Sequence, residues 1–397
     1  MEPVSVFPLA TVTNFNHHGR VMKMCLSYLT LPRLAAVAVL AISAPALSAQ
    51  NVTTDPVGAV VIPLKAGSDT RISLPLHRPV ALEALVGSIS GNVITLQSPV
   101  SMTASQYVYA SPAQTDTFYV QFTSGNREGM FYTVTANDAT TLTINPNNDV
   151  NLDNNVAPGD TVRVIPYWTL NTLFPNGQGL YASPTLVPVS SILLPQLATA
   201  GINLPANTSY FYYSGNSFGG PGWKKSGDLT HFYPDLTFPP DAFFIVRITT
   251  GNPDTQLVLT GDVPMSAQAI IVNDLNPSLK QDNAVAIPVP VPVTFGSSGL
   301  FPNIVSGSPT LVPTDSVLLY DPTAGGFNKP SSATYFYYTG SSFGGPGWRK
   351  SGDLTTIRNS DILFQPGGAF ILRRAARATP GSNIWTFVPP YLPAPPP

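Results

Sequence analysis

Short apolar runs alternate with turn-forming residues along most of this chain, and helical periodicity is nearly absent. The runs are bounded by Gly, Pro, Asn and Asp, a pattern typical of short β-strands. The 397 residues include 42 prolines, and a proline cannot donate to a sheet, so the strands must be short or lie at sheet edges. The pattern predicts an all-β fold with strands over 57–64, 93–96, 119–122, 132–135, 142–144 and 243–248.

One block of the sequence occurs twice. Residues 210–230 and 335–355 are identical at eighteen of twenty-one positions, at an offset of 125 residues. The offset continues upstream, where Ser183–Pro188 recurs as Ser308–Pro313. A repeat of this length indicates two copies of one folding unit. We therefore predict two homologous β-sandwich-like units.

The spacing around the repeat predicts a domain inserted into the first unit. In the second unit a Pro-x-x-x-Pro strand leads almost directly to Leu300-Phe-Pro302, whereas the matching Leu173-Phe-Pro175 arrives about 85 residues later than this spacing requires. Structureless loops longer than about 15 residues are uncommon. Residues 80–166 are therefore predicted to form a small β-barrel of short antiparallel strands, an arrangement that removes exposed sheet edges.

These boundaries give a predicted organisation for the whole chain. It assigns residues 50–79 and 167–262 to the first unit, 80–166 to the inserted barrel, 263–388 to the second unit and 389–397 to a proline-rich tail. We expect that tail to be extended and poorly packed.

Residues 1–49 have the composition of a secretory signal peptide. Basic residues precede an apolar run from Leu34 to Ile42, and small residues follow it. This order predicts cleavage between Ala46 and Gln50 and export to the cell envelope or the medium. The run is shorter than the roughly 20 apolar residues that cross a bilayer, so we expect no stable membrane span after cleavage; a permanent anchor is the alternative.

Composition narrows the chemistry further. The single cysteine, Cys25, lies in the predicted signal peptide, so the mature chain would have no disulfide, thiolate metal site or cysteine nucleophile. Charged residues make up only 10% of the chain and the net charge is −2. Nothing in this distribution would attract nucleic acid or an anionic membrane surface.

Four segments carry a resemblance to other proteins. They are Asp-Pro-Val-Gly near the predicted mature start, Ser-Leu-Pro-Leu-His-Arg-Pro at 73–79, Ile-Pro-Tyr-Trp-Thr-Leu at 165–170 and Val-Pro-Met-Ser at 263–266. Together they resemble an uncharacterised family of secreted bacterial proteins, over most of the mature chain. The resemblance implies export and a β-rich structure, and it carries over no functional residue.

Few residues are suited to acid–base catalysis. The mature chain would have two histidines and two glutamates, His77, His231, Glu83 and Glu128. No nucleophile elbow is present, and Thr356 replaces His231 in the second copy. Asp228 and Asp353 match within Ser-Gly-Asp-Leu-Thr, but this pattern favours a tight turn with an Asx hydrogen bond over a carboxylate catalyst. We predict no catalytic function and no cofactor.

One loop has the spacing of a calcium site. Asp149–Asp160 places oxygen ligands at positions 1, 3, 5 and 12 of a twelve-residue loop. Against this, Asn154 replaces the usual glycine at position 6, the last ligand is a short Asp, and strands flank the loop. A plain surface loop is favoured, calcium stays the alternative, and no metal ligand is assigned.

The repeated block contains the candidate ligand-binding residues. Residues on a strand alternate between faces, so the Tyr-Phe-Tyr-Tyr run at 210–213 makes both faces apolar, as in an interior strand. The Gly-rich loop that follows ends in a tryptophan, which either packs on the core or stands out as a platform for sugar rings. The candidates are Trp223, Trp348, Tyr212 and Tyr337. Two exposed platforms would give avidity for a polymer.

Two function classes follow from these features. The favoured one is a secreted, non-enzymatic structural or cell-surface β protein whose repeated blocks build the fold. The alternative is a carbohydrate-binding module that uses the repeated aromatic loops. Expected partners are an extracellular polysaccharide or other envelope proteins. Exposure of Trp223 and Trp348 on a common surface would favour binding, and burial of both would leave it without a site.

Overall fold

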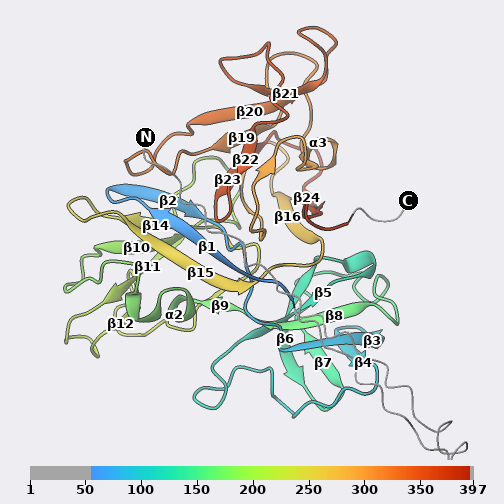
Figure 1. Cartoon of the computed structure of the whole chain (residues 1–397), viewed down its shortest axis with the longest axis vertical. Helices are drawn as coiled ribbons and strands as arrows, with labels where there is room; N and C mark the ends of the chain where they lie inside the picture. Colours follow the sequence, from blue (N-terminus) through green and yellow to red (C-terminus); the bar gives the residue numbers. More distant parts are fainter. Residues whose placement is uncertain (1–54, 394–397) are drawn as a thin grey trace, which may run out of the picture. The chain divides into compact units, whose positions relative to one another are not determined.

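The computed structural model describes residues 55–393, and nearly all of their regular structure is β-strand (Figure 1). The prediction of a signal peptide lies outside the described residues. Within residues 55–393, no helix has the length and apolar character needed to cross a membrane. The strands form several antiparallel sheets and one closed barrel, which confirms the predicted all-β, sandwich-like fold class with a small barrel.

The first unit packs a five-stranded sheet against a two-stranded ribbon. In spatial order the sheet strands are β12 (Gly222–Lys225), β11 (Thr208–Tyr213), β10 (Ser190–Leu194), β14 (Phe244–Ile248) and β2 (Ser68–Ile72). The ribbon pairs β1 (Val57–Leu64) with β15 (Thr255–Asp262). Alternation along these strands turns Leu64 and Leu257 of the ribbon and Phe244 of the sheet into one hydrophobic core.

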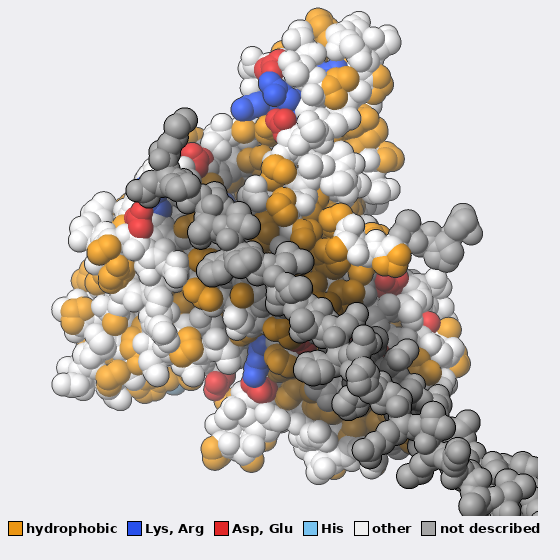
Figure 2. Space-filling model, in the orientation of Figure 1, with side chains coloured by type: hydrophobic (Ala, Val, Ile, Leu, Met, Phe, Trp, Pro, Cys, Tyr) orange, Lys and Arg blue, Asp and Glu red, His pale blue; other side chains and the backbone are white. Residues whose placement is uncertain are grey.

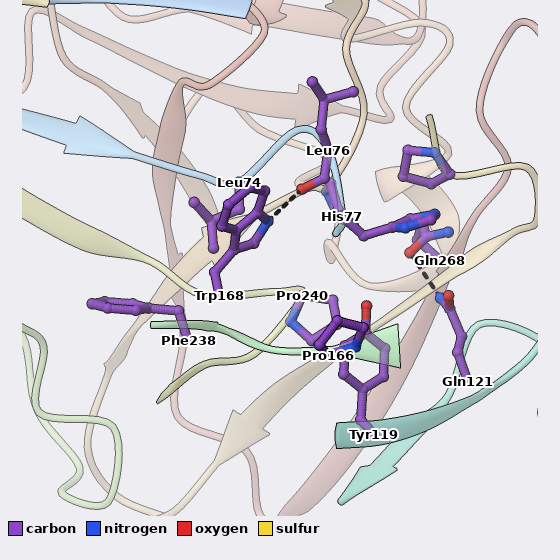
Figure 3. A pocket seen from close by; sticks show the side chains of 12 residues that line it. Leu74, Leu76, His77, Tyr119, Gln121, Pro166, Trp168, Phe238, Pro240 and Gln268 are labelled. Atoms are coloured by element: carbon purple, nitrogen blue, oxygen red, sulfur yellow. Dashed lines mark hydrogen bonds between the residues drawn. The ribbon is translucent and has the colours of Figure 1, made fainter. Parts of the chain in front are cut away.

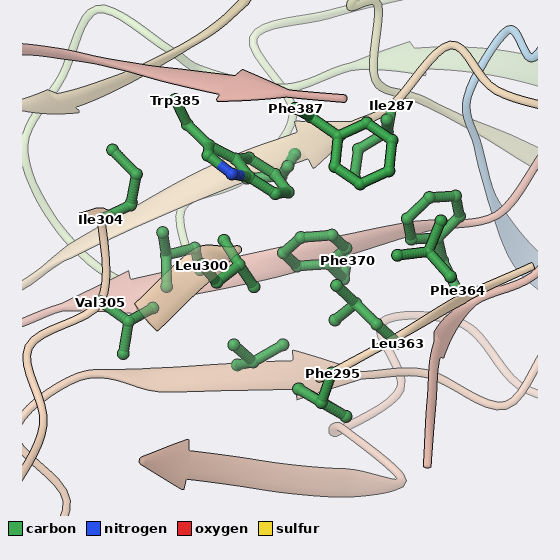
Figure 4. Close-up of a cluster of buried hydrophobic side chains, with 14 of the residues drawn as sticks. Ile287, Phe295, Leu300, Ile304, Val305, Leu363, Phe364, Phe370, Trp385 and Phe387 are labelled. Carbon is green, nitrogen blue, oxygen red and sulfur yellow. The ribbon is translucent and has the colours of Figure 1, made fainter. Parts of the chain in front are cut away.

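The second unit has the same architecture. Its sheet strands are β21 (Gly347–Lys350), β20 (Ala333–Tyr338), β19 (Ser316–Leu319), β23 (Ala369–Arg374) and β17 (Gln281–Ala286). The ribbon pairs β16 (Gln268–Asp274) with β24 (Gly381–Phe387). Figure 4 shows the core between them, where Trp385 and Phe387 of the ribbon lie near Phe370 of the sheet and Leu300.

Smaller elements also correspond between the two units. A short helix, α2 (Leu170–Leu173) or α3 (Leu300–Asn303), follows the first strand of a two-stranded pair. These pairs are β9 (Trp168–Thr169) with β13 (Thr237–Phe238) and β18 (Val293–Thr294) with β22 (Ile362–Phe364). Pairing within the repeated block is the same in both units, with Tyr212 opposite Trp223 and Tyr337 opposite Trp348.

A closed six-stranded barrel stands in the chain between β2 and β9. Its strands are β3 (Leu82–Ser90), β4 (Val93–Leu96), β5 (Phe118–Phe122), β6 (Phe131–Asn137), β7 (Thr141–Ile144) and β8 (Thr161–Pro166), closed in the order β3-β4-β7-β6-β5-β8. Gly91 makes the β3–β4 turn at a φ of 59°, where glycine costs least. The excursion over residues 97–117, between β4 and β5, was not anticipated from the sequence.

The two units form matching hydrogen bonds with each other, in which the edge strand of each sheet contacts a loop of the other unit. On one side the N–H of Asp69 in edge strand β2 donates to the carbonyl of Gly326 (3.2 Å), and the N–H of Asn328 donates to the Asp69 carboxylate (2.7 Å). Gly326 and Asn328 lie between β19 and β20 of the second unit. This contact covers the edge of the first sheet, which would otherwise be open to pairing.

The second sheet has the same protection in return. The N–H of Asp282 in edge strand β17 donates to the carbonyl of Gly201 (2.9 Å), and the N–H of Asn203 donates to the Asp282 carboxylate (2.8 Å). Gly201 and Asn203 lie between β10 and β11 of the first unit. Because each unit offers the same edge and the same loop to the other, the contact has the self-complementary form of a twofold dimer interface.

The expectation of a poorly packed tail from Pro389 is wrong for its described part. Tyr391 packs against the core of the second unit, and its hydroxyl donates to the carbonyl of Pro264 (2.7 Å). Burial of the ring raises the pKa of this tyrosine. The reason is the tyrosine itself, whose large apolar ring offsets the low packing tendency of its proline neighbours.

Candidate functional site

Both tryptophans of the repeated block are core residues. Trp223 is 1% exposed and Trp348 is 2% exposed. The Trp223 ring meets Tyr212 edge to face at 5.7 Å, and Trp348 meets Tyr337 in the same way at 5.6 Å. Neither indole is therefore available to stack on a sugar ring, and the carbohydrate hypothesis loses the platform on which the sequence placed it.

The two candidate tyrosines are half-buried, and protein covers them. Tyr337 stacks on Phe301 with ring centroids 3.6 Å apart and planes 8° apart. Tyr212 instead lies against Gly177, where an added Cβ would stand 2.7 Å from the tyrosine Cγ. The structure thus pairs each tyrosine with the tryptophan of its own unit, inside that unit.

The cations beside the tryptophans are also internal. Lys224 and Arg349 are both fully buried. The Lys224 ammonium donates to the carbonyl of Phe218 (2.9 Å), and the matched Arg349 guanidinium donates to the carbonyl of Phe343 (2.9 Å). Desolvation lowers the pKa of Lys224. These side chains donate to carbonyls of the Gly-rich loops from the protein interior, so they do not reach outward to ligand hydroxyls.

Phe218 and Phe343, the residues held in this way, are the exposed aromatics of the repeated loops. Each is 49% exposed and adopts a positive φ, 54° and 55° respectively. That conformation is unfavourable for a bulky side chain. In both units, therefore, the carbonyl that accepts from the buried cation belongs to a residue in a strained conformation. Nothing in the sequence indicated a positive φ at these two residues, since glycines fill the loop around them.

Asp228 and Asp353 occupy turns, as the sequence pattern favoured. Asp228 accepts hydrogen bonds from the hydroxyls of Tyr233 (2.5 Å) and Thr230 (3.1 Å), and Asp353 accepts from Thr356 (2.9 Å) and from Arg358. Donation from Tyr233 is the main cause that lowers the pKa of Asp228, and donation from Arg358 lowers that of Asp353. Both carboxylates therefore stay ionised within the turn.

The Asp149–Asp160 loop does not gather its oxygens at one point. Asp149 pairs with Arg127 (2.7 Å) and accepts from the Tyr132 hydroxyl (2.7 Å). Asp160 accepts from the N–H of Ala157 (2.8 Å) within its own turn. Over residues 55–393, no three His, Cys, Asp or Glu side chains come together in a way that would hold a metal ion.

A small cavity lies where the barrel meets both units (Figure 3). Its volume is about 10 Å³, which accommodates a single water molecule. Three of the four segments that carry the family resemblance contribute to its lining, through residues such as His77, Trp168 and Pro264. Two hydrogen bonds join residues of its lining, from Trp168 Nε1 to the carbonyl of Leu76 (2.9 Å) and from Gln121 Nε2 to Gln268 Oε1 (3.2 Å).

His77 in this cavity is a buried, satisfied histidine. Its Nδ1 lies 2.7 Å from the carbonyl of Arg78, so Nδ1 carries the proton and donates it to that oxygen. Burial lowers the pKa of His77. The ring thus bonds within its own segment, and the small volume leaves no room for a substrate.

A larger open groove lies between the barrel and the first unit, with a volume of about 290 Å³. The barrel side contributes Tyr109 and Thr117, and the first unit contributes the segment 232–236. Sequence reasoning missed this groove because its two walls are more than 100 residues apart in the chain.

Comparisons with protein-family models, curated proteins and solved structures gave no match for this chain. The resemblance to secreted bacterial proteins accordingly stays a prediction.

Proposed function

We propose that this protein is exported and acts, without catalysis, as a structural or cell-surface β protein. The main support is the structural role of the repeated block in both units. Its tryptophans lie in the two cores and its buried cations hold the loops above them. Side chains that would serve a shared ligand site are thus occupied in maintaining each unit.

The reciprocal contact between the units supports the same proposal. Both β2 and β17, the strands at one edge of each sheet, are covered by the other unit. Covered edges resist unwanted pairing with other chains, a property suited to a protein that persists outside the cytoplasm. Its partners would be envelope components.

The test combines location with turnover. Cells of the native host are fractionated, and the N-terminus of the recovered protein is sequenced. We expect protein in the envelope or medium that starts between Ala46 and Gln50, and no hydrolysis of chromogenic esters or glycosides. Cytoplasmic protein that retains Leu34–Ile42 would contradict export, and measurable turnover would contradict the absence of catalysis.

A further inference from the structure

The open groove has aromatic walls from two parts of the chain. Tyr109 is 41% exposed and Phe232 is 44% exposed, and Tyr233 and Pro234 add further apolar surface. The Tyr109 hydroxyl donates to Asp235 Oδ2 (2.7 Å) and joins one wall to the other. A volume of about 290 Å³ is near the lower end of small-molecule sites, which begin at about 300 Å³.

The wall from the first unit is held by backbone hydrogen bonds. The N–H of Tyr233 donates to the carbonyl of Trp223 (3.0 Å), and the carbonyls of Pro234 and Leu236 accept from the N–H groups of Asn171 and Leu170 (3.0 and 3.1 Å). These bonds tie the segment to β12 and to helix α2. The wall is thus ordered before any ligand arrives, which reduces the entropy cost of binding.

The barrel wall is ordered as well. Within the excursion, Ala110 and Gln114 exchange two backbone hydrogen bonds (2.8 and 2.9 Å). Near its end, Asp116 pairs with Arg78 (2.6 Å), and the carbonyl of Thr117 accepts from the N–H of Tyr167 (2.8 Å). The position of Tyr109 is therefore fixed by the turn that carries it.

Charge limits which ligands fit this groove. Asp235 is the one charged residue among those that line it, so an anionic ligand would be repelled. The Lys224 ammonium lies 3.4 Å from the centre of the Phe232 ring. That ammonium occupies one face of the ring and weakens its attraction for a second cation, although the Asp235 carboxylate itself attracts cations. Charge therefore excludes an anionic ligand, and the other groups of the groove decide between a cationic and a neutral one.

Polar groups in the groove match a ligand rich in hydroxyls. The Asp235 carboxylate has acceptor sites beyond the one that Tyr109 uses, and Thr117 adds a hydroxyl. Aromatic faces beside hydroxyl-binding groups suit a pyranose ring, which has apolar C–H faces and a polar rim. The groove is open along the surface, so a longer chain of sugars would extend beyond it.

The second unit repeats the block that precedes the groove but not the residues that line it. Residues 231–236 read His-Phe-Tyr-Pro-Asp-Leu, whereas the matched residues 356–361 read Thr-Ile-Arg-Asn-Ser-Asp. Ile357 takes the place of Phe232, and Arg358 takes the place of Tyr233. The copies thus diverge at the point where the first unit meets the barrel and the groove forms.

We propose that the groove of Tyr109, Phe232 and Asp235 binds a neutral polysaccharide, with the two rings stacking on sugar and the carboxylate accepting from its hydroxyls. This goes beyond the proposed structural role and does not depend on it. It also places carbohydrate binding at residues other than Trp223 and Trp348.

Isothermal titration calorimetry of the mature chain tests the proposal. The probes are cellohexaose, laminarihexaose and maltohexaose, with hexagalacturonate and choline as charged comparators. We expect at least one neutral hexasaccharide to bind and both charged probes to bind more weakly. Absence of binding by all three neutral probes at millimolar concentration would overturn the proposal, as would tighter binding of either charged probe.

Two variants locate the binding. Phe232→Ile introduces the residue that the second unit uses at this position, so the fold is kept while the ring is lost. Tyr109→Ala removes the opposite ring. Each should weaken binding by up to roughly tenfold, the worth of one good aromatic contact. Unchanged binding in both would refute the site.

The matched control is Phe343→Leu, which removes a similarly exposed aromatic ring from the second unit. It should bind like the wild type. An equal loss in this control would show that the effect is not specific to the groove. Thermal unfolding of every variant checks that each is folded, and Tyr109→Phe, which keeps the ring, should retain most of the affinity.

Discussion

In the first unit Phe232 lies over Gly222, and in the second Ile357 lies over Gly347. An added Cβ on either glycine would meet the covering side chain, at 2.5 and 3.0 Å respectively. The residue after each covering side chain, Tyr233 or Arg358, donates its N–H to the carbonyl of the core tryptophan of its unit. One backbone arrangement therefore accepts two different sets of side chains. The comparison separates residues that build the unit, which are shared, from residues that line the groove beside the barrel in the first unit, which differ in the second.

The largest expected change in stability comes from removal of the shared tryptophans. Trp223→Ala and Trp348→Ala should each lower the free energy of unfolding by about 3–5 kcal/mol, because each leaves a large cavity in a closed core. Urea denaturation followed by circular dichroism measures the change. If either variant kept the stability of the wild type, that indole would not be the core residue described here.

The reciprocal interface offers a second test with a smaller effect. Asp69 pairs with Arg247 and Asp282 pairs with Arg373, each at 2.7 Å, and each carboxylate also accepts an N–H from the other unit. Asp69→Ala should cost about 3 kcal/mol, because it leaves the guanidinium without its partner.

Asp282→Ala should cost less than Asp69→Ala. The Asp282 side chain is 14% exposed against 2% for Asp69, so solvent already weakens the ion pair and the hydrogen bonds that its removal would lose. Urea midpoints of the two variants, measured side by side, give the ranking. The reverse order would mean that the burial of the carboxylate does not determine how much each half of the interface contributes.

The smallest expected effect concerns pH and the turn carboxylates. The pKa values of Asp228 and Asp353 are lowered in the folded state. A lowered carboxyl pKa stabilises the fold above the unfolded value of about 3.9, and this contribution is lost as pH falls through the folded value. Each side chain is 32% exposed, so solvent limits the effect.

The variants Asp228→Asn and Asp353→Asn test this expectation. Both should be slightly less stable than the wild type at neutral pH, and both should lose less stability on acidification. Urea midpoints taken at a series of pH values below about 5 measure the slope. If the stability of both variants fell as steeply with decreasing pH as that of the wild type, neither turn would contribute to the loss of stability in acid.

Much of the fold was predictable because it is encoded locally. Alternating apolar residues and glycine turns gave the barrel strands, since period-2 patterns and turn chemistry act over a few neighbouring residues. The hairpin at Gly91 is an example. The repeat predicted two similar units because it can be found without knowing any contact.

The rest depends on contacts between distant residues. The sequence did not reveal whether Trp223 faces a core or solvent, because a Gly-rich loop permits both. The groove needs Tyr109 to meet Asp235, 126 residues away, and no local pattern indicates that contact. The bond between Asp69 and Asn328, across 259 residues, was invisible for the same reason.

The reciprocal contact between the units also determines how the protein responds to dilution. Two separate copies joined by such an interface would dissociate as their concentration fell. Here both halves belong to one chain, so each meets the other at a fixed effective concentration that the solution around them does not change. For a protein released into a large external volume, the pairing of its halves would persist however few molecules were present.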